Sequence, residues 1–384
     1  MPLIGFLVSF LSLIQKSTRA ILKFCGYVHS MPKVIYCLFI LAKFMNRNII
    51  DGLNFASKLN NRRVWNLLKL LASYYYSKSV KKPFVAGNPI YMEIEPTTSC
   101  NLRCPQCPSG LREFTRNTGM LDMGLYTKII DEVHKDLLWL ILYFQGEPFL
   151  NKQFLEFVKY AAQKNIYTVT SSNAHYFTDE MAKATVESGL DRLIISIDGT
   201  TQETYSKYRV GGDFDKVIDG TQKLLYWKKT LNKKTPHIIW QFIAFKHNTH
   251  QIPDIKKLAK KIGVNELGIK TAQIYDYQTS DTFIPEQEDL RRYTKAADGT
   301  YQIKNELLNQ CWRMWRGSVI TWDGLVVPCC FDKDATHRFG DVGKEPFMNI
   351  WRSNQYNAFR QAILKSRKEI DICTNCSEGT KVWS

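Results

Sequence analysis

Between residues 90 and 271, short apolar segments alternate regularly with helical patterns, which leaves few folds open to the chain. The apolar segments are often β-branched, as buried strands are, and cover Ile90–Glu95, Leu138–Phe144, Tyr167–Ser171, Arg192–Ile197, His237–Phe245 and Glu266–Thr271. The pattern between them predicts helices over Gly124–Lys135, Gln153–Lys164, Thr178–Ser188, Phe214–Lys229 and Ile252–Lys261. Successive strand–helix units predict a parallel sheet with helices outside, either doubly wound or barrel-like.

Polar and glycine-containing motifs directly follow five of these predicted strands. In chain order they are Ser99–Pro108, Gln145–Pro148, Ser172–Asn173, Asp198–Gly199 and Lys246–Asn248. Ligands of parallel α/β folds bind at the carboxyl ends of the strands. We therefore expect these motifs to meet at one site on that edge of the sheet.

Three cysteines, Cys100, Cys104 and Cys107, lie close together in the first of these motifs. This spacing allows three thiolates to converge on one metal centre. A structural zinc site needs four ligands, as does a fully ligated 4Fe–4S cluster. Three thiolates on a 4Fe–4S cluster would leave one iron open for a substrate or cofactor. The alternatives are a zinc site with a distant fourth ligand, or free thiols.

The Cys100-x3-Cys104-x2-Cys107 pattern resembles the signature of radical S-adenosylmethionine (SAM) enzymes, whose fold is a partial (β/α)6 barrel. The resemblance covers about residues 90–271 and implies an α/β, TIM-like fold. Gly146, Glu147 and Pro148 are similar to the family's GGEP segment, which holds the SAM amino group, although Gln145 replaces its first glycine.

Further motifs match the family in the same order. Ser172 and Asn173 resemble the segment near the SAM ribose and carboxylate. Segments containing Ser196, Asp198 and Arg209 are similar to those of the SPASM-type subgroup. The resemblance makes Arg209 a candidate for binding the SAM carboxylate. The alternative for Asp198 and Arg209 is a structural ion pair.

A second cysteine set lies near the C-terminus. Cys311, followed after twelve residues by Gly324 and after four more by Cys329, resembles the opening of a SPASM auxiliary-cluster domain. Cys373 and Cys376 complete four ligands, which suffice for a closed 4Fe–4S cluster. Full SPASM domains hold two clusters; because only eight residues follow Cys376, we expect a shortened domain with one. Cys330 is either a fifth ligand or a buried thiol, and a four-cysteine zinc ribbon is the alternative for the whole set.

The resemblance implies an oxidoreductase-like enzyme. It would reductively cleave SAM to a 5′-deoxyadenosyl radical, with an electron from a donor such as flavodoxin or ferredoxin, and abstract hydrogen from a C–H bond. Clusters and thiolates require a reducing cytoplasm. We expect oxidation of a small-molecule or membrane-linked substrate, with peptide modification as the alternative. A non-enzymatic electron-transfer or zinc-binding protein is the alternative of another class.

The positive charge is concentrated in the N-terminal segment. Residues 1–90 contain thirteen Lys and Arg but one acidic residue, Asp51, and so supply +12 of the net charge of +16. The body is nearly neutral, so we expect no nucleic-acid partner. Residues 1–14 and 34–42 are apolar but too short to span a membrane, and we expect no cleaved signal peptide.

A helical pattern follows in the same segment. Val64, Leu67, Leu68, Leu71 and Tyr75 have helical spacing, with Lys and Arg nearby. The segment is either a cap docked on the main domain or a peripheral contact with the anionic inner face of the membrane. We divide the chain into a basic, apolar, mainly helical extension (1–86), a barrel (87–300) and an auxiliary Fe–S domain (301–384).

Overall fold

The computed structural model describes residues 49–275, 277, 278, 282–304 and 306–376. The apolar runs over residues 1–14 and 34–42 lie outside these described residues. The chain divides after Gly52, and the unit from Leu53 onward contains the sheet and both cysteine sets. Within the described residues, no helix is long and apolar enough to cross a membrane.

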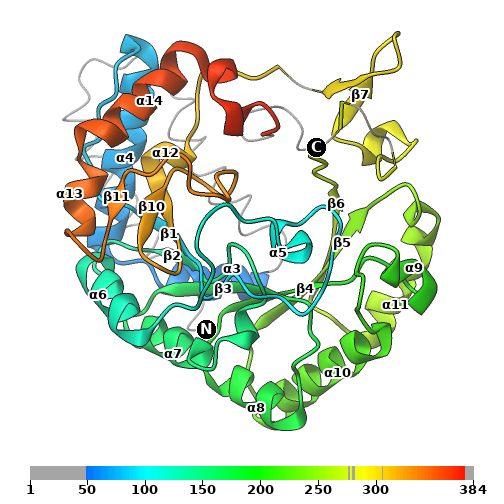
Figure 1. The fold of residues 1–384 in the computed structure, drawn as a ribbon. Coiled ribbons are helices and arrows are strands. Elements are labelled where there is room, and N and C mark those ends of the chain that lie inside the picture. The colour runs from blue at the N-terminus through cyan, green and yellow to red at the C-terminus, as the bar shows by residue number, and fades with distance from the viewer. Residues whose placement is uncertain (1–48, 276, 279–281, 305, 377–384) are drawn as a thin grey trace. The chain divides into compact units, whose positions relative to one another are not determined.

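A nine-stranded sheet with the order β11-β10-β9-β1-β2-β3-β4-β5-β6 organises this unit (Figure 1). Its parallel part consists of β1 (Tyr91–Ile94), β2 (Trp139–Ile141), β3 (Tyr167–Ser172), β4 (Arg192–Ser196), β5 (His237–Ala244) and β6 (Glu266–Thr271). These are the six strands that the sequence predicts. The curved parallel sheet confirms the TIM-like partial barrel of the expected fold class.

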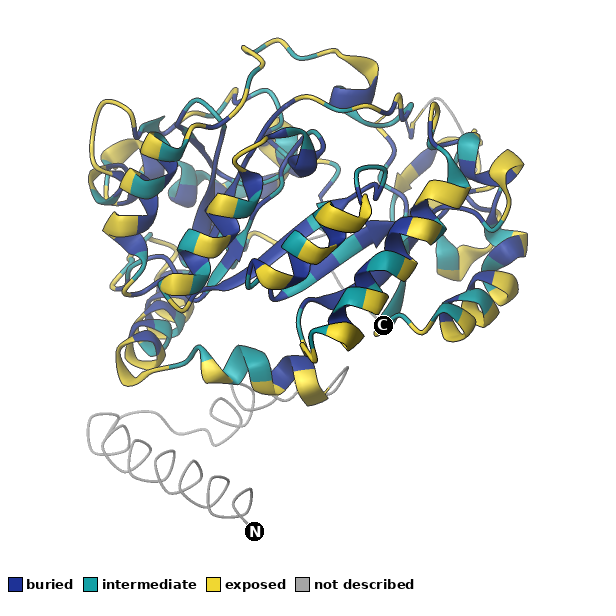
Figure 2. Cartoon of the chain, turned by 90° about the horizontal axis from the view of Figure 1, so that it is seen from below, coloured by how far each residue is buried: buried dark blue, intermediate teal, exposed yellow. Residues whose placement is uncertain are grey.

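The helices that follow the strands lie on the outer side of the curved sheet (Figure 1). They are α6 (Met123–Val133), α7 (Phe154–Gln163), α8 (Asp179–Glu187), α10 (Phe214–Thr230) and α11 (Ile252–Ile262), with the short α5 (Pro108–Leu111) and α9 (Gln202–Ser206) in loops. Their apolar residues face the sheet, while exposed residues face outward (Figure 2). Met92, Leu140 and Trp240 point into this layer and are fully buried. Because side chains alternate along a strand, their neighbours face the inside of the barrel.

The C-terminal part extends the sheet beyond β1. β9 (Gly317–Ile320) pairs in parallel with β1, and β10 (Leu325–Val327) and β11 (Gly340–Asp341) continue it antiparallel. A Cβ at Gly317 would lie 1.8 Å from the Tyr91 carbonyl oxygen, so only glycine permits this pairing. The remaining elements are α12 (Arg313–Arg316), α13 (Phe347–Trp351), α14 (Asn354–Ser366) and a separate hairpin of β7 (Tyr293–Lys295) and β8 (Tyr301–Ile303).

The described part of the N-terminal extension is helical, with α3 (Ile49–Ser57) and α4 (Asn61–Val80). α4 docks mainly through a polar face. The buried Arg63 guanidinium donates to the carbonyl oxygens of His134 and Asn165, at 3.0 and 2.5 Å. Tyr74 packs on Trp315 of the C-terminal part, with ring centroids 5.3 Å apart. The sequence correctly predicts the helix, and this docking is the one that the cap alternative predicts.

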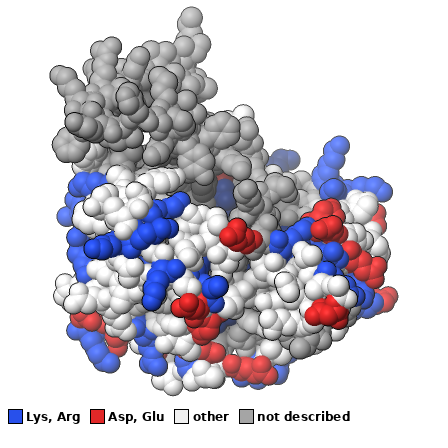
Figure 3. All heavy atoms as spheres, turned by 90° about the horizontal axis from the view of Figure 1, so that it is seen from above, with Lys and Arg blue, Asp and Glu red and all other residues white. Residues whose placement is uncertain are grey.

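Charges of both signs are interspersed on the face drawn in Figure 3. On the surfaces of α7 and α10, Glu156 pairs with Lys159 and Asp219 with Lys223, one helical turn away in each case. Exposed pairs of this kind contribute little to stability. They place opposite charges side by side, as expected for a chain body that is nearly neutral.

Candidate functional site

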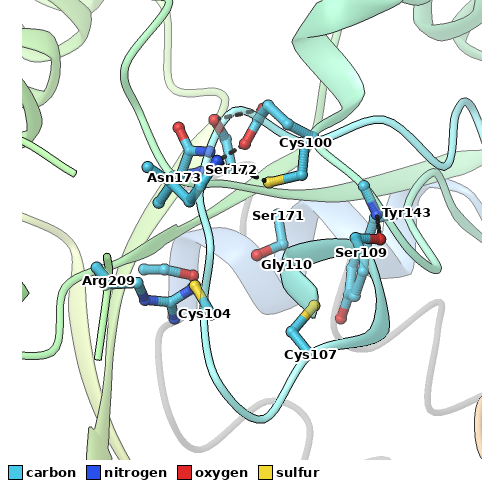
Figure 4. A pocket seen from close by; sticks show the side chains of 14 residues that line it. Cys100, Cys104, Cys107, Ser109, Gly110, Tyr143, Ser171, Ser172, Asn173 and Arg209 are labelled. Atoms are coloured by element: carbon cyan, nitrogen blue, oxygen red, sulfur yellow. Dashed lines mark hydrogen bonds between the residues drawn. The ribbon is translucent and has the colours of Figure 1, made fainter. Parts of the chain in front are cut away.

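A pocket at the carboxyl ends of the strands brings the first cysteine set together with the neighbouring motifs (Figure 4). The predicted site residues that line it are Cys100, Cys104, Cys107, Gly146, Glu147, Ser172, Asn173, Ser196 and Arg209. Leu102, Ser109, Gly110, Tyr143 and Ser171 complete the lining. Pro148 and Asp198 lie next to lining residues but are not part of the lining. The predicted convergence of motifs at one strand edge is therefore present in the fold.

The cysteine loop is held by backbone contacts rather than by regular structure. The Cys107 N–H donates to the Cys104 carbonyl at 3.2 Å, and Arg103 N–H to the Val210 carbonyl at 2.9 Å. A Cβ at Gly110 would lie 2.5 Å from backbone atoms of Cys104, so the turn after the motif requires glycine. All three thiols face the same space, and burial raises the pKa of Cys100 to about 12. Binding a metal cluster here would therefore release protons.

Gly146 fixes the second motif against the cysteine loop. Its φ is +73°, and a Cβ would lie 2.4 Å from the Thr97 carbonyl oxygen and 2.7 Å from that of Ser99. Its N–H donates to Ser109 Oγ at 2.8 Å. Gln145 is not among the residues with positive φ, which explains why a side chain can replace the family's first glycine there.

Replacing Gly146 with Ala should therefore disrupt the pocket. Left-handed φ costs a non-glycine residue about 1–2 kcal/mol, and we expect the clash with two carbonyls to add at least about 2 kcal/mol. Urea unfolding and equilibrium dialysis with SAM measure both effects. Gly263→Ala is the matched control, because Gly263 has a φ of +86° but nothing within 4 Å of its Cβ position. Equal stability losses in the two variants, with SAM binding intact, would contradict the role of the close approach.

The Glu147 side chain is the centre of a hydrogen-bond network in the pocket. Its carboxylate accepts hydrogen bonds from Ser172 Oγ at 2.9 Å and from Asn173 N–H at 2.8 Å. Burial raises its pKa to about 7, although these hydrogen bonds oppose the rise. Asn173 Nδ2 in turn donates to Asn101 Oδ1 at 2.7 Å. The network joins the ends of β2 and β3 to the cysteine loop and presents a carboxylate to the pocket.

Asp198 and Arg209 form a buried ion pair, with Arg209 Nε 2.6 Å from Asp198 Oδ2. Asp198 also accepts a hydrogen bond from the Ile243 N–H at 2.7 Å. The other end of the guanidinium reaches the pocket, where Nη1 lies 3.8 Å from Cys104 Sγ. Asp198 thus positions Arg209, and Arg209 retains donors that face the pocket.

Two further polar residues lie at or near the pocket without belonging to a predicted motif. Tyr143 lines the pocket, and Glu93 is buried beneath it, where it accepts a hydrogen bond from Tyr91 Oη at 3.0 Å. Burial raises the pKa of Glu93 to about 7. The position of Glu93 follows from strand alternation, because Tyr91 and Glu93 share one face of β1, opposite the apolar Met92. The signal in the sequence was Glu93 itself, a charged residue within the otherwise apolar β1.

The second cysteine set is also brought together. Cys311, Cys373 and Cys376 are buried, and Cys329 is close enough to Cys311 and Cys376 for their charges to interact. Burial raises the pKa of Cys373 to about 12. Cys330 also interacts with Cys329, and its Sγ accepts a hydrogen bond from Arg313 Nη1 at 3.6 Å. Four thiols from three separated segments are the number of donors that a closed cubane cluster requires. Among the described residues, no three His, Cys, Asp or Glu side chains are arranged around a single metal ion.

Comparison with known proteins identifies both regions. Residues 94–225 match the model of the radical SAM superfamily, and residues 311–377 match SPASM, an iron-sulfur cluster-binding domain. A "tungsten-containing aldehyde ferredoxin oxidoreductase cofactor-modifying protein" of Pyrococcus furiosus is 28% identical over 320 residues, covering 75% of this chain and 87% of that protein. The PqqA peptide cyclase of Gluconobacter oxydans is 22% identical over 314 residues, covering 77% and 84%.

Solved structures share the fold. anSMEcpe with bound AdoMet has a TM-score of 0.56 at 16% identity, covering 76% of this chain and 86% of that chain. Streptococcus suis SuiB bound to its precursor peptide SuiA has a TM-score of 0.57 at 13% identity, covering 77% and 71%.

This chain belongs to the radical SAM superfamily and carries a C-terminal SPASM domain. It is a radical SAM enzyme, as the cysteine pattern and strand order predict.

Proposed function

We propose that the chain holds two 4Fe–4S clusters, one on Cys100, Cys104 and Cys107 and a single auxiliary one on Cys311, Cys329, Cys373 and Cys376. The observation that carries the first assignment is the shared pocket of three thiols and the Glu147 network. The convergence of four mostly buried thiols supports the second. Analysis of anaerobically purified protein for iron and acid-labile sulfide tests both. Zinc in place of iron and sulfide contradicts them.

The pocket residues have the chemistry to hold SAM beside the first cluster. When bound, cluster and SAM supply a 5′-deoxyadenosyl radical, which takes a hydrogen atom from a substrate C–H bond. Glu147 offers a carboxylate to the SAM amino group, with Gly146 and Pro148 shaping its loop. Arg209, oriented by Asp198, offers donors to the SAM carboxylate. Ser172, Asn173 and Ser196 line the side left for the nucleoside. The walls exclude water from the reacting atoms.

We propose a small-molecule or membrane-linked substrate that the enzyme oxidises. The exposed face of α4 supports the membrane-linked form. Trp65 and Tyr76 are 55% and 57% exposed, and Val64 and Tyr75 are each 37% exposed. Exposed lysines, Lys69 among them, flank these side chains. Aromatic and aliphatic side chains beside cations are typical of helices that lie in an anionic membrane interface.

Full-length protein should therefore co-sediment with vesicles of phosphatidylglycerol and phosphatidylcholine. It should bind more weakly at high salt, because salt screens exposed charges. Replacing both Trp65 and Tyr76 by Ser should lower the partition coefficient at least about tenfold, which corresponds to about 1.4 kcal/mol. Tyr226→Ser is the matched control, since Tyr226 is 59% exposed on α10. Protein that remains in the supernatant at low salt would contradict membrane binding, and α4 would then be only a cap on the main domain.

Peptide modification is the second candidate. The names of two relatives support it: the PqqA peptide cyclase, and SuiB bound to a precursor peptide. The Pyrococcus relative is named for modifying a cofactor, which favours a small molecule. Anaerobic assays with SAM, using cell lipid extracts in one arm and co-encoded short peptides in the other, distinguish the two classes by which one changes mass.

The proposed chemistry also defines the remaining partners. The first cluster needs an external one-electron donor such as flavodoxin or ferredoxin. The thiolate ligands need a reducing compartment. We therefore propose a cytoplasmic enzyme, peripheral on the inner face of the membrane.

A further inference from the structure

Arg367 is aimed directly at the second cysteine set. It is fully buried, and its Nη2 lies 3.1 Å from Cys376 Sγ. The guanidinium is fixed by a second bond, from Nη1 to the Gln310 carbonyl at 2.9 Å. The strongest electrostatic partners of the Cys373 thiol include this same arginine. A buried cation therefore touches one of the four thiols and acts on another.

Arg292 approaches the same thiols from another segment, directly before β7. It is 9% exposed, and its Nε and Nη1 are buried without a hydrogen-bond partner among the described residues. Its charge interacts with Cys376. A buried guanidinium with unsatisfied donors is costly unless an anion lies close to it. Tyr293 and Cys330 also interact with the charge of Arg292. Burial raises the pKa of Tyr293, so the Cys376 thiol, which gives up its proton when it binds a metal, is the group that becomes an anion there.

A cubane with four thiolate ligands is an anion and gains a further negative charge when it is reduced. Fixed cations and N–H···S hydrogen bonds stabilise the reduced form more than the oxidised form, and so raise the reduction potential. Interactions of this kind are strong in a buried, low-dielectric environment. Arg367 provides both the charge and the hydrogen bond, whereas Arg292 provides charge and unused donors.

We propose that Arg367 and Arg292 raise the reduction potential of the auxiliary cluster and so poise it to accept an electron from the substrate. This inference rests on the proposed function, which assigns a cluster to these four cysteines. A cluster held by these four cysteines would supply a one-electron acceptor. A substrate radical left by hydrogen abstraction would lose one electron to it and one proton to solvent, for a total loss of two hydrogens, and an external acceptor of the flavodoxin or ferredoxin class would take the electron from the cluster.

Redox titration monitored by electron paramagnetic resonance tests this directly, without any substrate. The background is the protein with Cys100, Cys104 and Cys107 replaced by Ala, in which the auxiliary cluster alone gives a signal. We expect Arg292→Met to lower the reduction potential by about 59 mV, which is a tenfold smaller equilibrium constant for one-electron reduction. Arg367→Met should lower it at least as much, and Arg367→Lys should restore part of the shift because it keeps the charge.

Arg352→Met is the matched control, since Arg352 is an exposed arginine of the same C-terminal part and should leave the potential unchanged. Arg292→Met carries the test if Arg367→Met loses its cluster, because Arg292 Nε and Nη1 give up no hydrogen bond. An intact cluster at the wild-type potential in Arg292→Met overturns the inference. A background protein without any cluster overturns the proposed function, and this inference with it.

Discussion

Replacing Cys100, Cys104 and Cys107 together by Ala is expected to halve the iron content of the anaerobically prepared protein and to abolish SAM cleavage. Two 4Fe–4S clusters give about eight iron atoms per chain, so about four should remain on the auxiliary site. SAM cleavage should fall to the level of a reagent blank, because the only iron with an open coordination position is lost. Iron and sulfide analysis, with chromatography of 5′-deoxyadenosine, measures both results.

Cys330→Ala is the matched control for this experiment. Cys330 is a cysteine of the SPASM domain whose Sγ is bonded to Arg313, and we do not assign it to either cluster. The variant should keep both the iron content and SAM cleavage. Equal iron losses in the two variants would show that cysteine replacement acts through folding. Full iron content in the triple variant would contradict the assignment of the first cluster.

The barrel and its site were predictable because their signals are local. Each strand is a short apolar run, and each motif lies within a few residues of a strand end. Parallel strands end at one edge, so order along the chain places Cys104, Glu147 and Asn173 in one pocket. Arg209, which also lines it, follows α9 and was indicated by the family resemblance instead. For Asp198 and Arg209 the structure contains both predicted features. The two side chains form an ion pair, and Arg209 also faces the pocket.

The pairing of β9 with β1 could not be read from the sequence. It joins segments more than two hundred residues apart, and the signal for it is a single glycine, Gly317, which approaches the Tyr91 carbonyl. The docked face of α4 was equally hidden. Apolar spacing points to Val64 and Tyr75, yet the buried side carries Arg63, because carbonyl groups of the barrel satisfy its guanidinium. Long-range partners of this kind override the hydrophobic pattern.

The auxiliary site depends on both kinds of information. Cysteine spacing predicts the ligands. The buried arginines beside them are Arg367, directly after α14, and Arg292, directly before β7. No spacing rule connects these residues to the cysteines. Their relation to the cysteines is visible only in the fold, which places the Arg367 guanidinium 3.1 Å from Cys376 Sγ.

Replacing Cys373 and Cys376 by Ala separates the two roles that the auxiliary cluster can have. As an electron acceptor, the cluster takes the electron that hydrogen abstraction leaves on the substrate. The variant should then still cleave SAM but form no product that lacks two hydrogens. As a structural staple, the cluster contributes only folding energy. A variant without it should then make normal product wherever it folds.

The measurement follows both products in one anaerobic reaction with dithionite, SAM and a lipid extract of the source cells. Chromatography reports 5′-deoxyadenosine, and mass spectrometry reports species that lose two hydrogens with the wild type. Iron analysis must show about four atoms per chain, which proves that the first cluster remains in a folded barrel. Removing both thiols also leaves Arg367 without its sulfur partner, so we expect a lower unfolding midpoint under either role. Normal oxidised product from such a variant would exclude electron transfer and leave the cluster as a staple.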